Sequence, residues 1–109
     1  MNNKTKLVIV AASLLVSSAS FASQKLDTCK IVATAASNIM SGRQNGVEAA
    51  EVYEKIETKM KDGPEKNMMT IMVGDAYQYP KMHSQQFIDR AIAEFKNKYF
   101  IACMMGMKE

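Results

Sequence analysis

Residues 84–105, SQQFIDRAIAEFKNKYFIACMM, decide the fold, because they carry the longest and clearest helical pattern in the chain. Their apolar residues recur at spacings of three and four, which places them on one face of a helix. These apolar residues are Ile88, Ala91, Ile92, Phe95, Tyr99, Ala102 and Cys103. Ser84 is a favourable N-cap residue, so the sequence predicts a helix that opens there and continues to about Met105.

Three further helical patterns precede this stretch, at residues 26–43, 47–61 and 64–79. Asp27 is the expected N-cap of the first helix, and Gly46 suits the left-handed conformation that ends it. Pro64 is tolerated at the first position of the third helix. Gly74 costs about 1 kcal/mol relative to alanine inside that helix, which makes it the least secure of the four.

The chain is predicted to be all-α, since no stretch alternates in the manner of a strand. Short connections favour antiparallel neighbours, so we expect a small up-and-down bundle of three to four helices. In such a bundle the start of the first helix and the end of the last lie together. Cys29 and Cys103 occupy these two positions, and we expect one disulfide between them.

The N-terminal residues have the features of a cleavable signal peptide. Lys4 and Lys6 precede an apolar run at 7–16, and small residues at positions 20 and 22 place a cleavage before Ser23. The apolar run is shorter than the roughly 20 residues that span a bilayer, so no stable membrane span is expected after cleavage. The predicted organisation is a signal peptide at 1–22 and one helical domain at 23–109, in a periplasmic or secreted protein.

The charge of the chain gives no reason to expect a nucleic-acid partner. The 14 basic and 11 acidic residues give a net charge of +3, and loss of Lys4 and Lys6 with the signal lowers it to +1. A balance so close to neutral lacks the basic stripe that binding to phosphate needs.

The residues that carry chemistry are few, and the sequence predicts neither an enzyme nor a cofactor. His83 is the only histidine, which rules out the familiar multi-histidine zinc sites. A small hydrolase would need His83 to activate a nucleophile, for which the sequence offers only its neighbour Ser84. Adjacent residues rarely face each other in that way, so we expect a loop histidine beside an N-cap serine.

Methionine is unusually frequent, with 10 in the chain. Thioethers suit Cu(I), and Met104, Met105 and Met107, with His83, form one alternative copper site in an exported protein. The competing interpretation is that methionine fills core gaps, as expected for Met40, Met68 and Met72, or builds an adaptable contact surface. Such a surface would also suit the seam of a homo-oligomer.

A set of short motifs resembles a known group of proteins. The motifs are Cys29, Arg43-Gln44-Asn45-Gly46-Val47, Ala76-Tyr77-Gln78-Tyr79-Pro80, Ile92-Ala93-Glu94-Phe95 and Cys103. In this order they resemble an uncharacterised family of small, signal-bearing, single-disulfide helical proteins of Gram-negative bacteria and their phages and prophages. The resemblance implies export, a disulfide and a helical fold, and it implies no activity.

Four residues of these motifs are candidates for a partner-binding patch: Arg43, Gln44, Tyr77 and Tyr79. Arginine and tyrosine are frequent anchors of protein interfaces. The architectural alternative is that Arg43 and Gln44 complement a helix end while Tyr77 packs against a neighbouring helix. We expect a non-enzymatic module that binds a protein of the cell envelope, in phage–host interference or envelope stress.

Overall fold

The computed structural model describes the backbone of residues 2–106 and the side chains of residues 23–106. Within these residues there are four helices and no strand, which confirms the all-α prediction. The helices are α1 (Asn2–Gln44), α2 (Ala49–Lys59), α3 (Pro64–Ala76) and α4 (Gln85–Met104).

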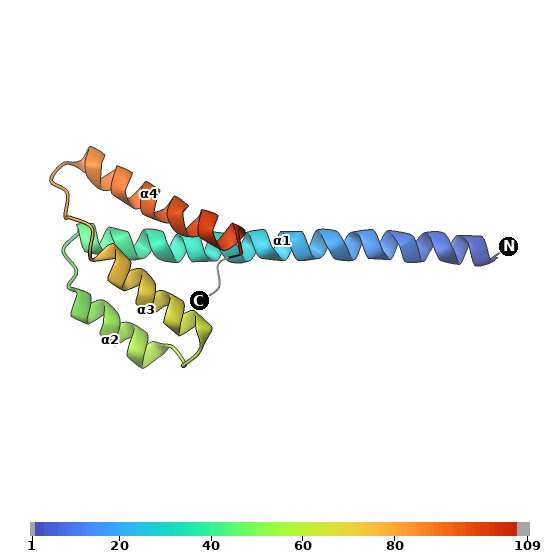
Figure 1. The fold of residues 1–109 in the computed structure, drawn as a ribbon, viewed down its shortest axis with the longest axis horizontal. Coiled ribbons are helices and arrows are strands. Elements are labelled where there is room, and N and C mark those ends of the chain that lie inside the picture. The colour runs from blue at the N-terminus through green and yellow to red at the C-terminus, as the bar shows by residue number, and fades with distance from the viewer. Residues whose placement is uncertain (1, 107–109) are drawn as a thin grey trace.

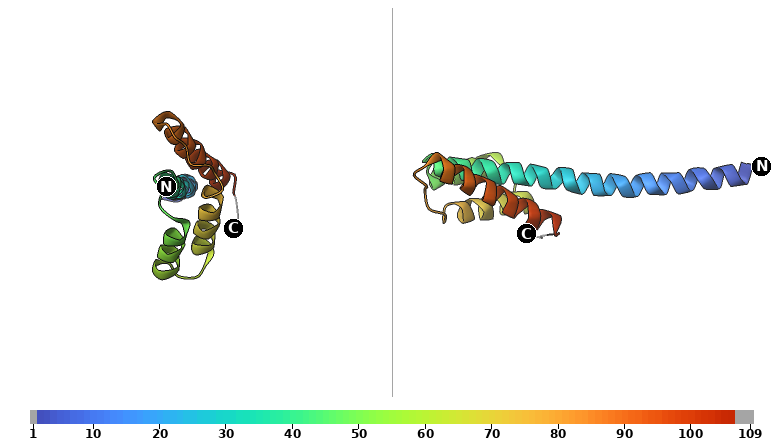
Figure 2. Two further views of the ribbon diagram at one scale, coloured as in Figure 1. Left: turned by 90° about the vertical axis from the view of Figure 1, so that its left-hand side faces the viewer. Right: turned by 90° about the horizontal axis from the view of Figure 1, so that it is seen from above.

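The helices form an open arrangement around the second half of α1. The main packing pairs are α1 with α4, α1 with α3, and α2 with α3. Helix α2 therefore lies on the far side of α3 from α4 (Figure 1). The first half of α1 extends well beyond the other three helices (Figure 1 and the right panel of Figure 2).

The core lies where α1, α3 and α4 meet. Its largest fully buried side chains are Cys29, Met40, Met72, Val73 and Phe95. The ring of Phe95 packs edge-on against Tyr79, with ring centroids 5.5 Å apart, and against Tyr99 at 4.9 Å. The apolar stripes predicted for these helices therefore do face one another, with α4 supplying the aromatic centre.

Helix α1 begins much earlier than the residue pattern predicted. The N-cap role predicted for Asp27 is wrong, because the helix runs through this residue without interruption. Residues 7–26 contain neither glycine nor proline, so no residue in this segment stops the helix. For the same reason Cys29 lies in the second half of α1 and not at the start of the first helix.

The C-terminal end of α1 is closed as predicted at Gly46, which has a φ of +85°. The Gly46 N–H donates to the Arg43 carbonyl at 3.3 Å, and the Val47 N–H donates to the Gly42 carbonyl at 2.9 Å. This pair of bonds is the Schellman motif that ends many helices. The backbone of Val47 takes part in this motif, which is one reason that α2 begins at Ala49 and not at residue 47.

Helix α3 ends at Ala76, earlier than predicted. A proline disfavours helical backbone at the residue before it, and here Tyr79 precedes Pro80. Gly74 lies inside α3 for a steric reason. A Cβ atom built at Gly74 would lie 3.3 Å from the Tyr53 hydroxyl of α2. The glycine therefore gives up helix propensity and allows α2 to approach α3 closely.

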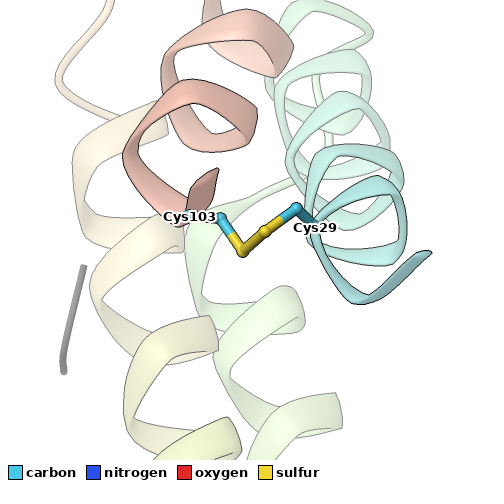
Figure 3. The surroundings of a disulfide bond; sticks show 2 residues. All are labelled: Cys29 and Cys103. Atoms are coloured by element: carbon cyan, nitrogen blue, oxygen red, sulfur yellow. A yellow bond between two sulfur atoms is a disulfide. The ribbon is translucent and has the colours of Figure 1, made fainter. Parts of the chain in front are cut away.

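The predicted disulfide is present and joins α1 to the last turn of α4 (Figure 3). The Cα atoms of Cys29 and Cys103 are 5.5 Å apart, and Cys29 is almost fully buried. The bridge spans a sequence separation of 74 residues. In the chain-entropy model, a loop of this length stabilises the folded state by roughly 4 kcal/mol.

We predict that replacing both cysteines with alanine lowers the free energy of unfolding by about 4 kcal/mol. Urea denaturation followed by circular dichroism measures this difference. Ile101→Ala is the matched control, since Ile101 is exposed near the same end of α4 and its loss should change stability little. A double alanine variant as stable as the parent would contradict the role assigned to the bridge.

Candidate functional site

Two regions of the described surface are candidate sites. One is the predicted patch at the end of α1. The other is an apolar groove between α1 and α3, which the sequence pattern did not locate.

The structure brings the four residues of the predicted patch together, and we call them the end clasp: Arg43, Gln44, Tyr77 and Tyr79. The Arg43 Nε donates to the Tyr79 carbonyl at 3.1 Å. The Arg43 guanidinium also lies 5.4 Å from the centroid of the Tyr77 ring, within cation–π range. The end clasp thus joins the last turn of α1 to the segment that follows α3.

Gln44 is the centre of the end clasp and is only 3% exposed. Its Nε2 donates to the Pro80 carbonyl at 3.0 Å, and its Oε1 accepts from the Met82 N–H at 2.7 Å. One amide side chain therefore holds the connection between α3 and α4 against α1. Its burial means that a partner protein can reach the end clasp only through the half-buried Arg43, Tyr77 and Tyr79.

Tyr77 ties a second connection to the same place. Its hydroxyl donates to the Val47 carbonyl at 2.6 Å, which links the end of α3 to the turn between α1 and α2. Burial raises the pKa of Tyr77, although the Arg43 charge acts in the opposite direction. Gln44 and Tyr77 thus have architectural roles, although Gln44 bonds to the connection between α3 and α4 and does not complement the end of its own helix as the alternative supposed.

We predict that Gln44→Ala lowers the free energy of unfolding by about 2–3 kcal/mol, because the Met82 N–H and the Pro80 carbonyl lose their partner. Thermal and urea denaturation measure the loss. The neighbouring Asn45→Ala is the matched control, since Asn45 is exposed and bonds only to Ser41 through its side chain. Equal stability of the two variants would contradict the structural role assigned to Gln44.

A polar cluster that the sequence did not single out links α3 to α4. Both the Lys98 Nζ and the Tyr99 hydroxyl donate to the Asp75 Oδ2, at 2.7 and 2.8 Å. Burial, and then the bond to Asp75, raise the pKa of Tyr99 far above its usual range. The bond to Asp75 likewise raises the pKa of Lys98. The sequence signal was a carboxylate next to the apolar stripe of α3, although nothing in it identified Tyr99 as the partner.

We predict that stability falls above about pH 10. Tyr99 and Lys98 have higher pKa values in the folded chain than when unfolded, so the folded state retains protons that the unfolded state loses. Their contribution is complete below the unfolded pKa values of about 10 and is lost as the pH rises toward the folded values.

Unfolding free energies of the parent and Tyr99→Phe, measured between pH 8 and pH 11.5, check this prediction. Above pH 10, the free energy of unfolding should fall less steeply with pH in the variant than in the parent. The difference in slope should correspond to up to about one proton per molecule. Identical slopes for the two proteins would contradict the role of Tyr99.

The second region is the methionine groove, a cavity of about 410 Å³ between α1 and α3. It is lined by Thr28, Ile31, Val32 and Ala35 of α1, by Met60, and by Pro64, Glu65, Met68, Met69 and Met72 of α3. Helix α3 approaches α1 at its C-terminal end and diverges from it toward Pro64, which opens the groove (Figures 1 and 2).

The methionines divide between the core and this groove. Met40 and Met72 are fully buried, so the expectation of core packing is confirmed for both. Met68 is only half-buried, as are Met60 and Met69, so it packs against the edge of the core and also lines the groove. Ile31, at 70% exposure, stands at the rim of the groove. The sequence feature that could have indicated this rim is Ile31 itself, because it lies outside the apolar stripe of α1.

The residues of the alternative copper site are not brought together. His83 precedes α4, whereas Met104 ends it and Met105 follows it. A helix of this length separates them by roughly 30 Å. Met107 lies outside the described residues. Within residues 23–106, no group of three or more histidine, cysteine, aspartate or glutamate side chains is placed to hold a metal ion.

The residues considered for a hydrolase also have other roles. His83 is exposed in the loop before α4. The Ser84 Oγ accepts from the Phe87 N–H at 3.3 Å, which confirms Ser84 as the N-cap of α4. The serine therefore serves the helix end, and the geometry supplies no activated nucleophile at this position.

Comparison with known proteins adds no family to this description. No family model matches the chain, and no curated protein or solved structure matches it. The resemblance to small single-disulfide proteins of Gram-negative bacteria and their phages therefore stays a prediction.

Proposed function

We propose that this chain is an exported, non-enzymatic module that binds an apolar helical segment of another protein in the cell envelope. The observation that carries the proposal is the methionine groove, with the exposed Ile31 at its rim. Apolar surface of this kind is typical of interaction sites. Methionine suits such a site because its flexible, polarisable side chain adapts to different partners.

Export is supported by two observations. The N-terminal residues have the pattern of a signal peptide, and the part of α1 that contains them extends away from the other helices (Figure 1). The disulfide is typical of proteins that mature in an oxidising compartment. Within residues 23–106, no helix combines the length and the apolar character that crossing a membrane requires. We place the protein in the periplasm or outside the cell.

The shape of the groove favours a helix as the bound element. One wall is a single helix, α1, and the other is the diverging half of α3, so the groove runs between two rods. An amphipathic helix that inserts its apolar face is a common occupant of a groove between helices. In keeping with the resemblance to phage and prophage proteins, we assign the partner to the envelope, in phage–host interference or envelope stress.

The test is chemical crosslinking in intact cells followed by purification of the chain. We expect the parent to recover one partner reproducibly, and Met68→Gln/Met69→Gln to lose it, because a polar amide disfavours burial of an apolar face. Ile71→Gln is the matched control, since Ile71 is 59% exposed on the same helix and does not line the groove.

Arg43→Gln tests the end clasp in the same experiment. If Arg43→Gln loses the partner and the methionine double variant recovers it fully, the partner binds at the end clasp and not in the groove. Thermal denaturation of each variant shows whether a loss reflects unfolding. Recovery that no variant reduces would reject both surfaces.

A further inference from the structure

Four methionines line the methionine groove, and they come from two parts of the chain. Met68, Met69 and Met72 belong to α3. Met60 lines the same groove from the residue that directly follows α2. The fold therefore gathers in one cavity thioethers that the sequence separates by a turn and a helix start.

The four side chains lie at two depths. Met72 is fully buried and packs in the core beneath the groove. Met60, Met68 and Met69 are half-buried, so a small ligand can reach them from solvent. A methionine side chain has three rotatable bonds, and these three can turn their sulfur atoms toward one ligand without disturbing the core.

The chemistry of these sulfur atoms selects a particular kind of ligand. Thioethers are soft and uncharged donors, which suit Cu(I) and suit hard cations such as Mg²⁺ and Ca²⁺ poorly. Thiolates would be stronger soft ligands, but both cysteines of the chain are joined in the disulfide. The methionines are therefore the soft donors that this groove offers to a metal ion.

The charge at the groove also favours a cation. A Cu(I) ion brings one positive charge to a mostly apolar surface, which costs free energy unless an opposite charge lies nearby. Glu65 lines the groove, and none of the described residues that line it is basic. The carboxylate of Glu65 therefore attracts a cation that enters, and no lysine or arginine of the lining repels it.

We propose that the methionine groove binds one Cu(I) ion through the sulfur atoms of Met60, Met68 and Met69, with Glu65 compensating its charge. This site differs from the copper site that the sequence suggested, whose residues are not brought together. The inference goes beyond the proposed function and does not depend on it, because the thioethers can hold a metal ion whether or not a protein binds there.

Competition with a colorimetric Cu(I) chelator tests the site, with ascorbate keeping the metal reduced. We expect the purified parent to retain one equivalent at micromolar concentration. Met68→Leu/Met69→Leu should weaken binding at least about tenfold, because residues that only support a metal ligand already change metal affinity by about that factor. Leucine and methionine are similar in volume, so this variant should fold like the parent.

Met104→Leu/Met105→Leu is the matched control, since these two methionines lie at the end of α4 and do not line the groove. It should retain Cu(I) as the parent does. Mass spectrometry verifies that the disulfide is intact in each sample, because free thiolates would bind Cu(I) themselves. X-ray absorption spectroscopy of the loaded parent should show sulfur as the main ligand of the metal.

Three results would overturn the metal site. The first is a parent that gives up all its Cu(I) to the chelator. The second is a groove variant that binds as tightly as the parent, or a control that weakens binding as much as the groove variant does. The third is a spectrum dominated by nitrogen, which would assign the metal to His83, the only histidine of the chain.

The metal site and the proposed function fail in different experiments. Met68→Leu/Met69→Leu removes thioethers but keeps the groove apolar, so it should still capture the partner in cells, whereas Met68→Gln/Met69→Gln should lose both ligands. Capture of a partner by a chain that retains no Cu(I) overturns only the metal site. Retention of Cu(I) by a chain that captures no partner overturns only the proposed binding to an envelope protein. Circular dichroism of each variant verifies folding.

Discussion

The fold depends on one constraint, the attachment of α4 to α1 at both ends of their contact. At one end Cys29 and Cys103 are joined covalently. At the other end Gln44 holds the backbone of Pro80 and Met82, just before α4 begins. Between these ties, Phe95 and Tyr99 of α4 pack into the core with Met40 of α1. A small chain has little apolar surface to bury. Ties at both ends of the α1–α4 pair limit the conformational freedom of the chain, so the fold depends less on apolar burial alone.

Helix α3 is held less symmetrically than this pair. Its C-terminal end is fixed by Tyr77, which bonds to Val47, and by Asp75, which bonds to Lys98 and Tyr99. Helix α2 approaches α3 at Gly74 and is joined to its N-terminal end by the Lys66–Glu57 ion pair, but α2 is not one of the main neighbours of α1. The two ends of α3 therefore experience different constraints. The methionine groove lies at the end where α3 has diverged from α1, and the half-buried Met68 and Met69 line the gap.

The sequence predicted this frame better than it predicted the surfaces. The Gly46 helix end and the Ser84 cap each depend on one residue whose chemistry acts locally, and both were confirmed. The all-α class followed from helical spacing along the chain, and the disulfide from its two cysteines, and both were also confirmed. The start of α1 was wrong because Asp27 has the chemistry of a cap, whereas the neighbouring segment lacks any residue that stops a helix. A local preference yields when helix continues on both sides of it.

The candidate sites could be predicted only in part, because they depend on the angle between helices. The motif residues Arg43, Gln44, Tyr77 and Tyr79 do meet, but burial of Gln44 follows from how the α3–α4 connection crosses α1, which no spacing in the sequence encodes. Likewise, Met68 and Met72 lie on the same apolar side of α3 and both line the groove, yet Met72 is fully buried and Met68 is only half-buried. Only the divergence of α3 from α1 distinguishes them.

This divergence also accounts for the different character of the two groove walls. The α1 wall is part of the frame that is tied at both ends, and it carries the small residue Ala35 beside the branched Ile31 and Val32. The α3 wall is attached mainly at its far end and presents unbranched methionines, whose three rotatable bonds let them follow the shape of an occupant. An apolar helix entering this groove would meet one rigid surface and one adaptable surface.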